Sequence, residues 1–230
     1  MPDWMDNYGH LLLSGVFTTL SLLAVSAVLG FILAVLVALA RIARHPWVAR
    51  PALFYTSVLR GTPLLVQIYV FYYGLGSLFA GFPWLRTSVL WPVLREGYWY
   101  VVFALVLSVG AYVGEIIRSG LLAVPKGELE AAAAFGMRPR QVLLRVRLPR
   151  ALRLLLPILA GESVMLLKST ALASTIAVVD LLGAANVVRA QTLQVYGPLL
   201  LVAAIYLCLT LVIEGLFALA ERRGVPLRRG

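Results

Sequence analysis

Five long apolar stretches dominate the chain and restrict its possible folds more than any other feature. They cover residues 11–40, 52–80, 98–117, 151–179 and 197–220. A helix of about 20 apolar residues crosses the hydrocarbon core of a bilayer, and each stretch is long enough. Of the 230 residues, 61% are hydrophobic and only 13% are charged, which excludes an ordinary soluble domain. We therefore predict an all-α integral membrane protein with five transmembrane helices and a single domain over 1–230.

The placement of lysine and arginine predicts the orientation of these helices, because basic residues are retained on the cytoplasmic side. They gather after the first and third stretches and in the C-terminal tail, whereas the other two loops hold only Arg86, Arg95 and Arg189. Asp3 and Asp6 at the start replace the basic residues of a cleaved signal peptide. We expect the first helix to be retained, with the N-terminus outside and the C-terminus in the cytoplasm.

The net charge of +10 does not indicate a nucleic-acid partner. The basic residues are distributed by membrane side and do not form one stripe with interleaved aromatic residues. Aromatic residues instead cluster between the second and third stretches, as they do at a membrane interface. This cluster comprises Trp84, Trp91, Tyr98, Trp99 and Tyr100.

The sequence lacks the residue spacings of common enzymes. His10 and His45 lie near opposite membrane faces, and Cys208 is the only cysteine, so a zinc site is excluded. The dipeptide Lys168-Ser169 lacks the preceding glycine of a P-loop, which excludes ATP binding by that motif. We expect no enzyme activity, no metal and no cofactor in this chain.

A charged, alanine-rich segment at 126–149 separates the third and fourth apolar stretches. Glu128 lies in the first turn of a strongly helix-forming run, and Gly136 supplies a stop signal. Pro139 opens a second helical run, which Pro149 is expected to end or redirect. The pattern predicts two short cytoplasmic helices joined at a glycine corner, a shape that can enter a groove on a soluble partner.

The spacing in this segment resembles the EAA loop of ATP-binding-cassette (ABC) importer permeases. The matching positions, with valine for the usual isoleucine, are Glu130, Ala131, Ala132, Gly136, Val146, Leu148 and Pro149. Other matches to polar amino-acid permeases are Arg60-Gly61-Thr62-Pro63-Leu64, Gly110-Ala111-Tyr112 with Glu115, and Lys168-Ser169-Thr170-Ala171-Leu172-Ala173. With Val179-Asp180-Leu181-Leu182, the last string looks most similar to the M-type subunit of histidine, basic amino-acid and opine systems.

This resemblance implies a type I importer permease fold in a bacterial cytoplasmic (inner) membrane. It implies that 119–150 is a coupling loop that docks on an ABC ATPase dimer, which binds ATP and Mg²⁺. It also implies a second permease subunit, similar or identical, and an extracytoplasmic amino-acid-binding protein. The coupling residues would be Glu128, Glu130, Ala131, Ala132, Gly136, Leu148 and Pro149, with Glu130 and Gly136 critical. The alternative is a solvated loop held at the bilayer surface.

Ionisable residues within the apolar stretches mark a candidate substrate path, because charges are costly inside a bilayer. Arg60 and Glu115 are expected to pair, or to line an inner gate where Gly61 and Pro63 break the helix. Glu162 falls near mid-bilayer, where it can hold the cationic group of an amino acid or pair with a basic residue. The candidate path comprises Thr18, Arg60, Gln67, Glu115, Glu162, Lys168 and Thr170.

Two further expectations concern helix packing. The spacing of Gly110 and Gly114 permits close approach between helices. Glu214 and Glu221, near the inner end of the fifth stretch, are expected to pair with Arg222 and Arg223.

Together these features predict the permease subunit of an importer of polar, basic amino acids, such as histidine, arginine, lysine and ornithine, or of opines. ATP hydrolysis on a separate subunit would drive transport. One alternative is an ATP-independent channel or secondary carrier in which Glu115, Glu162 and Lys168 form an ion relay. A membrane-embedded enzyme is a third class, and the missing catalytic spacings disfavour it.

Overall fold

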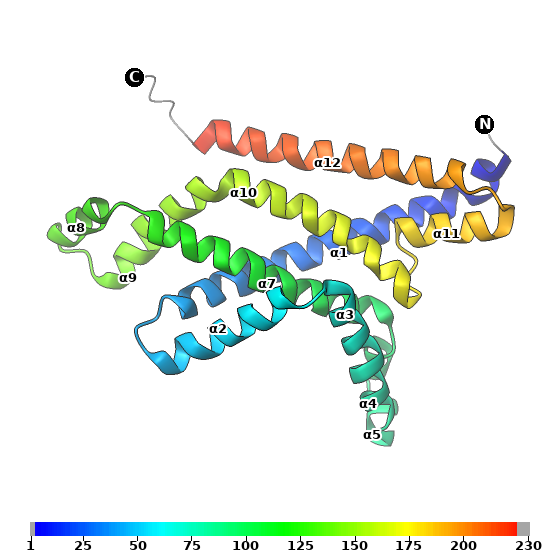
Figure 1. Cartoon of the computed structure of the whole chain (residues 1–230), viewed down its shortest axis with the longest axis horizontal. Coiled ribbons are helices and arrows are strands. Elements are labelled where there is room, and N and C mark those ends of the chain that lie inside the picture. The colour runs from blue at the N-terminus through cyan, green and yellow to red at the C-terminus, as the bar shows by residue number, and fades with distance from the viewer. Residues whose placement is uncertain (1–2, 225–230) are drawn as a thin grey trace.

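The computed structural model describes residues 3–224, in which all regular secondary structure is helical. Three helices are long and apolar enough to cross a membrane unaided: α1 (Asp3–Arg41), α7 (Gly97–Ala123) and α12 (Tyr196–Gly224). Figure 1 shows them lying lengthwise in the molecule. Two bent helix pairs raise the number of candidate spans to five if each pair counts as one. The predicted all-α architecture is confirmed for the described residues.

The second apolar stretch is broken at the position where the sequence places Gly61 and Pro63. Helix α2 (Pro46–Gly61) ends there, and α3 (Leu64–Tyr69) starts in a direction that differs by 105°. A proline disfavours helical backbone in the residue before it, and Thr62 is accordingly extended, with φ −118° and ψ 142°.

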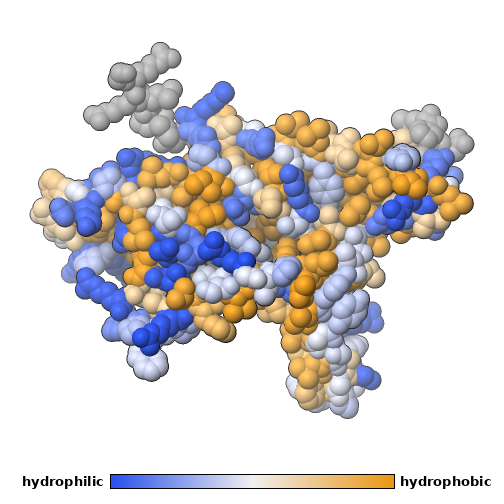
Figure 2. All heavy atoms as spheres, in the orientation of Figure 1, coloured by the Kyte–Doolittle hydropathy of each residue, from blue (hydrophilic) through white to orange (hydrophobic). Residues whose placement is uncertain are grey.

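The chain beyond this break forms a projection, here named the side arm, over residues 64–96. After α3 it contains the π-helix η1 (Val70–Leu75), α4 (Gly76–Ala80), α5 (Pro83–Arg86) and α6 (Trp91–Leu94). Figure 1 shows α3 and α4 leaving the body crosswise to α1 and α7. Figure 2 shows an apolar column of residues along the side arm beside a more polar one. The hydroxyl of Tyr100 on α7 donates to the Leu94 carbonyl at 2.6 Å and holds the base of the arm.

The fourth stretch is also interrupted. Helix α10 (Leu148–Ser169) continues as the 3₁₀-helix η3 (Thr170–Ile176), and α11 (Leu181–Thr192) follows after a bend of 46°. Ala177 adopts a left-handed conformation at the bend, with φ 61°. The Asp180 carboxylate then caps α11, accepting hydrogen bonds from the amides of Leu182 and Gly183 at 3.3 and 2.9 Å.

The cytoplasmic loop of the prediction begins as expected but ends differently. Helix α8 (Lys126–Ala134) is followed by the corner at Gly136, as predicted. The second helix does not end at Pro149, because α9 (Pro139–Gln141) and the π-helix η2 (Val142–Arg147) run directly into α10. A proline in a helix clashes with the carbonyl four residues before it. The wider π turn just before Pro149 gives that carbonyl room, so the expected stop is wrong.

Helix α1 packs along α7 more extensively than any other pair of described elements. A Cβ atom on Gly110 would lie 2.7 Å from the Leu33 side chain, and one on Gly114 would lie 3.0 Å from Val37. The close approach predicted from the two glycines is therefore confirmed. Helix α2 rests on the same pair, and the Tyr55 hydroxyl donates to the α7 carbonyl of Leu107 at 2.6 Å.

The N-terminal part of α1 packs against α11 and α12. Thr19, fully buried, accepts a hydrogen bond from the Leu181 amide at 3.1 Å, and the Tyr206 hydroxyl lies 3.5 Å from the Asp180 carboxylate. Gly15 brings the backbones of α1 and α11 together, because a Cβ there would lie 2.9 Å from the Asp180 carbonyl oxygen.

The acidic residues of α12 do not pair as expected. Glu214 and Glu221 form no ion pair with Arg222 among the described side chains. Glu221 and Arg222 are adjacent on a helix and cannot face each other. The side chain of Arg223 lies outside the described part of the structure.

We expect Gly15→Ala to destabilise the protein, because its methyl group meets backbone atoms of Asp180 and Leu181 at 2.9 and 3.0 Å. The two helices must separate, at a cost of about 1–3 kcal/mol. Gly9→Ala is the matched control on the same helix, since a Cβ there meets nothing within 4 Å. The thermal unfolding midpoint of the detergent-solubilised protein measures both changes. Equal midpoints would contradict the tight contact of α1 with α11.

Candidate functional site

The elbow, here defined as α8, the corner at Gly136, and α9 with η2, forms one end of the molecule (Figure 1). Figure 2 shows hydrophilic residues gathered around this end. Gly136 has φ 77°, its amide donates to the Ala133 carbonyl at 2.9 Å, and the Met137 amide donates to the Ala132 carbonyl at 3.2 Å. These two bonds form a Schellman motif, which requires a left-handed residue and therefore favours glycine. The corner turns the chain sharply at the tip of α8.

The predicted coupling residues divide into an exposed and an inward-facing group. Glu130, Ala131 and Gly136 are exposed, and Phe135 beside the corner is 90% exposed. Ala132 is buried, while Leu148 and Pro149 are half-buried at the start of α10. The exposed group is the part of the motif that a docking partner can reach.

Glu128 differs from Glu130 in having a partner within the chain. Its carboxylate lies 3.4 Å from the guanidinium of Arg150, and both side chains are well exposed. A solvated pair of this kind contributes little stability, but it links α8 to the first turn of α10. Arg147 adds a second link, because its Nε donates to the Leu121 carbonyl of α7 at 2.9 Å. The elbow is thus attached to both helices that lead into the membrane part.

Glu115 on α7 lies between two arginines. Its carboxylate accepts hydrogen bonds from Nε of Arg41 at 2.6 Å and from Nε of Arg118 at 2.7 Å. The expected pair between Glu115 and Arg60 is therefore wrong. Because α1 packs along α7, the arginine at the end of α1 arrives at the level of Glu115, whereas Arg60 lies over the ring of Tyr112.

A cavity of about 810 Å³ opens mainly between α1, α7 and α10, and its wall is predominantly apolar. Glu162 is the only charged residue among the lining side chains. It is half-buried and forms neither a hydrogen bond nor an ion pair with another described side chain. The alternative prediction, that Glu162 pairs with a basic residue, is not confirmed among the described residues.

The other polar side chains in the cavity wall carry hydroxyl groups. Ser163 and Ser169 donate to carbonyls of their own helix, at 2.8 Å each. Ser108 and Tyr112 of α7 also line the cavity and were missed as site residues. Their spacing of four residues, which places them on one face of a helix, is the signal that could have identified them.

The other candidate path residues lie away from this cavity wall. Gln67, a buried residue, donates from Nε2 to the Leu59 carbonyl at 2.8 Å and so bridges the break after α2. Thr170 is fully buried and donates to its own helix, Thr18 donates to the Ser14 carbonyl, and Lys168 is exposed. Their membership of a substrate path stays a prediction.

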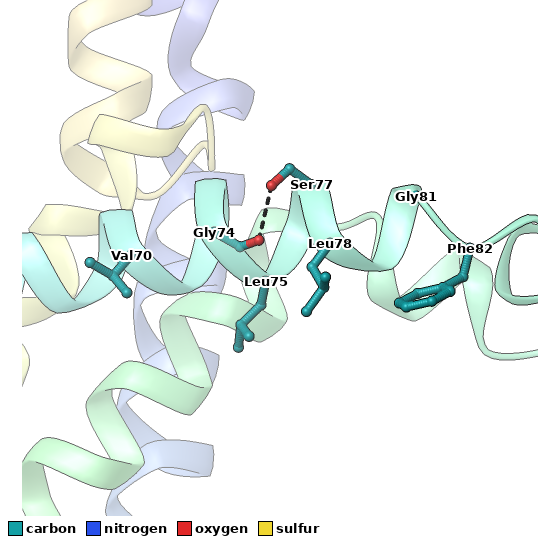
Figure 3. Close-up of a pocket in the computed structure, with 7 residues that line it drawn as sticks. All are labelled: Val70, Gly74, Leu75, Ser77, Leu78, Gly81 and Phe82. Atoms are coloured by element: carbon teal, nitrogen blue, oxygen red, sulfur yellow. Dashed lines mark hydrogen bonds between the residues drawn. The ribbon is translucent and has the colours of Figure 1, made fainter.

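A second hollow, of about 540 Å³, follows one face of the side arm. Figure 3 shows the residues that line it: Val70, Gly74, Leu75, Ser77, Leu78, Gly81 and Phe82. The hydroxyl of Ser77, the only polar side chain in this wall, donates to the Gly74 carbonyl at 2.9 Å. This hollow therefore offers no free side-chain group to a charged ligand, and the cavity at Glu162 is the better candidate.

Comparison with known proteins places this geometry in context. The family described as binding-protein-dependent transport system inner membrane component matches residues 26–224. The octopine transport system permease protein OccM of Rhizobium meliloti is 44% identical over 218 residues, which cover 95% of this chain and 87% of OccM. The histidine/lysine/arginine/ornithine transport system permease protein HisM of Salmonella typhimurium is 38% identical over 222 residues, covering 96% and 91% of the two chains.

Solved structures agree with the fold. A chain of an amino acid ABC transporter crystallised with histidines superposes with a TM-score of 0.82 and 33% identity, covering 95% of this chain and 96% of the other. A chain of the inward-facing MetNI methionine ABC transporter superposes with a TM-score of 0.74 at 20% identity, covering 94% and 96%. The second likeness concerns the fold alone.

Replacing Glu115 with glutamine leaves the guanidiniums of Arg41 and Arg118 close together without their counterion. We expect a loss of about 1–3 kcal/mol in stability, because these side chains are only partly exposed to solvent. Thermal unfolding in detergent measures the loss. Glu214→Gln on α12 is the control, since Glu214 is exposed and has no ion pair among the described residues. If the Glu115 variant is as stable as this control, the ion pairs of Glu115 with Arg41 and Arg118 do not stabilise the protein.

Proposed function

This chain belongs to the family of binding-protein-dependent transport system inner membrane components, and from this premise we propose the function of its two sites. It is the membrane-spanning permease subunit of an ATP-driven importer of amino acids or opines that carry a cationic group. One observation carries the proposal: the helix that begins at the exposed elbow is the helix that presents Glu162 to the cavity. The names of OccM and HisM support the substrate class.

Five spans result when each bent helix pair crosses the membrane once. The N-terminus then lies outside and the C-terminus lies in the cytoplasm. The positive-inside rule supports this orientation, because Arg41 pairs with Glu115 in the half of α7 that leads to the arginine-rich elbow. The location is the inner membrane of a bacterium.

The elbow docks in a cleft of the partner ATPase, which binds the ATP and Mg²⁺. Glu130 is exposed and lacks a partner among the described residues, so it is available to a basic residue of that subunit. The Gly136 corner and the exposed Phe135 give α8 a protruding tip. ATP-driven closure of an ATPase dimer would pull this tip.

The pull reaches the cavity through α10. Between Leu148 and Glu162 the helix rises by about 20 Å at about 1.5 Å per residue, with no intervening loop. Arg147 links the elbow to α7, and Arg150 links α8 to α10. A displacement at the elbow therefore changes the walls of the cavity directly.

Glu162 receives the cationic group of the substrate. A half-buried carboxylate in an apolar wall is costly without a counterion, and the described residues supply no ion pair. A passing cation replaces the missing partner. One chain with five spans makes half of a pathway, so a second permease subunit, two ATPase subunits and an external binding protein complete the transporter.

The ion-relay alternative, an ATP-independent channel or carrier, lacks its connections in the described structure. Glu115 is held by two arginines, and Lys168 is exposed outside the cavity wall. Transport by the purified chain without an ATPase would revive it.

For the elbow, we expect Glu130→Lys and Gly136→Leu to abolish most ATP-driven uptake while membrane insertion persists. The lysine would repel a basic docking residue, and leucine at φ 77° would be strained by about 1–2 kcal/mol. Uptake of radiolabelled L-arginine, L-histidine and L-lysine by proteoliposomes containing the complex is the measurement.

Two controls are matched to these variants. Gly127→Ala changes a glycine of the same helix that faces open space, and Glu221→Lys reverses a charge on α12. Both controls are expected to transport normally. Normal uptake in both elbow variants would exclude the elbow from coupling.

For the cavity, we expect Glu162→Gln to reduce uptake of cationic amino acids at least tenfold and that of neutral ones much less. Glutamine keeps the shape of the side chain but removes the charge that pairs with the substrate. Competing uptake of L-arginine and L-citrulline in the same proteoliposomes measures the difference. An equal loss for both compounds would show that Glu162 has a structural role.

A further inference from the structure

Arg60 is a second charged residue without a counterion in the apolar part of the chain. It lies at the end of α2, one residue before the break at Gly61. Its side chain is exposed and forms no ion pair within 4.0 Å among the described residues. An arginine at such a position is expected to face a partner or a polar cavity.

Tyr112 connects Arg60 to the cavity. The guanidinium carbon of Arg60 lies 5.5 Å from the centre of the Tyr112 ring, and the Tyr112 hydroxyl donates to the Arg60 carbonyl at 3.3 Å. The same tyrosine lines the cavity that contains Glu162. The ring holds the guanidinium by a cation–π contact, and the hydroxyl holds the last turn of α2.

Arg60 thus adjoins, through Tyr112, the cavity whose wall contains Glu162. The guanidinium of Arg60 and the carboxylate of Glu162 form no salt bridge with each other. Each charge therefore remains available to a ligand. The cavity volume of about 810 Å³ lies in the range of small-molecule sites and accommodates an amino acid.

We propose that Arg60 binds the carboxylate of the substrate while Glu162 binds its cationic end. The assignment rests on the proposed function and adds to it a requirement for opposite charges at the two ends of the substrate. A guanidinium matches a carboxylate with two parallel hydrogen bonds. An amine without a carboxylate satisfies only Glu162 and leaves Arg60 unpaired. The cavity thereby selects amino acids over the corresponding amines, independently of the external binding protein.

The test measures direct binding to the purified transporter complex in nanodiscs, without the external binding protein. The probes are L-arginine, L-histidine, L-lysine and L-ornithine, each with its decarboxylated amine: agmatine, histamine, cadaverine and putrescine. We expect the wild-type complex to prefer the amino acid in each pair. For Arg60→Gln we expect affinity for the amino acid to fall roughly tenfold to a hundredfold, the loss typical of a charged hydrogen-bonded pair, while affinity for the amine stays unchanged.

Two further variants keep the test decisive. Arg60→Lys retains a charge but loses the bidentate geometry, so we expect an intermediate preference for the amino acid. Arg50→Gln is the matched control, because Arg50 is an exposed arginine of the same helix, whereas Arg60 is the arginine that contacts the cavity-lining Tyr112. It is expected to bind every probe like the wild type.

The outcomes separate this inference from the proposed function. If Arg60→Gln weakens amino acid and amine equally, or neither, while the wild type still transports with ATP, Arg60 does not bind the carboxylate and the inference is wrong. If the wild type neither binds nor transports any of the four amino acids, the proposed function itself is wrong. Loss of preference in Arg60→Gln alone, with its unfolding midpoint retained, supports the assignment.

Discussion

Within a bilayer the hydrophobic effect does not draw two helices together, so close van der Waals packing must hold α1 against α7. Glycines at Gly30, Gly110 and Gly114 bring the two backbones near enough for side chains of one helix to fill the surface of the other. The rest of the described structure is arranged around this pair, because α2 and α10 both pack against α7. The cavity forms where the walls of α1 and α7 meet α10. The same side-by-side packing brings Arg41 to Glu115 and completes a charged cluster at the end of the pair.

The elbow and the cavity are joined by helix, and the continuity depends on a local irregularity. Pro149 would clash in a regular α-helix, but the π-helical turns of η2 let the helix pass it and continue to Glu162. Irregular helical turns recur at functional sites in proteins. Here the π-helix keeps the helical backbone continuous at a proline where the sequence predicts an end or a change of direction. The Gly136 corner, by contrast, is a true stop, since its left-handed backbone turns the chain out of α8.

Features that depend on neighbouring residues were predictable from the sequence. The helix at 126–134, the corner at Gly136, the break at Gly61 and Pro63, and the close approach at Gly110 each follow from backbone preferences or residue size. Features that depend on which helices face each other could not be predicted from the sequence. The partner of Glu115 is Arg41 instead of Arg60, because the pairing is decided by how α1 lies along α7 and not by depth along each span. The hydroxyl of Thr170 bonds its own helix, and Thr170 does not line the cavity.

The sequence by itself determined that the chain is helical and apolar enough for a membrane, and that it carries a charged helical segment that ends at a glycine corner. Composition and local backbone chemistry decide these properties, since they need no distant contact. Only the tertiary structure decided that α10 continues through Pro149, that Glu115 pairs with Arg41 and Arg118, and that Arg60 packs on a tyrosine of the cavity that contains Glu162. These outcomes depend on the rotation and register of helices that are far apart in sequence, which helix packing selects and the pattern of apolar residues leaves open.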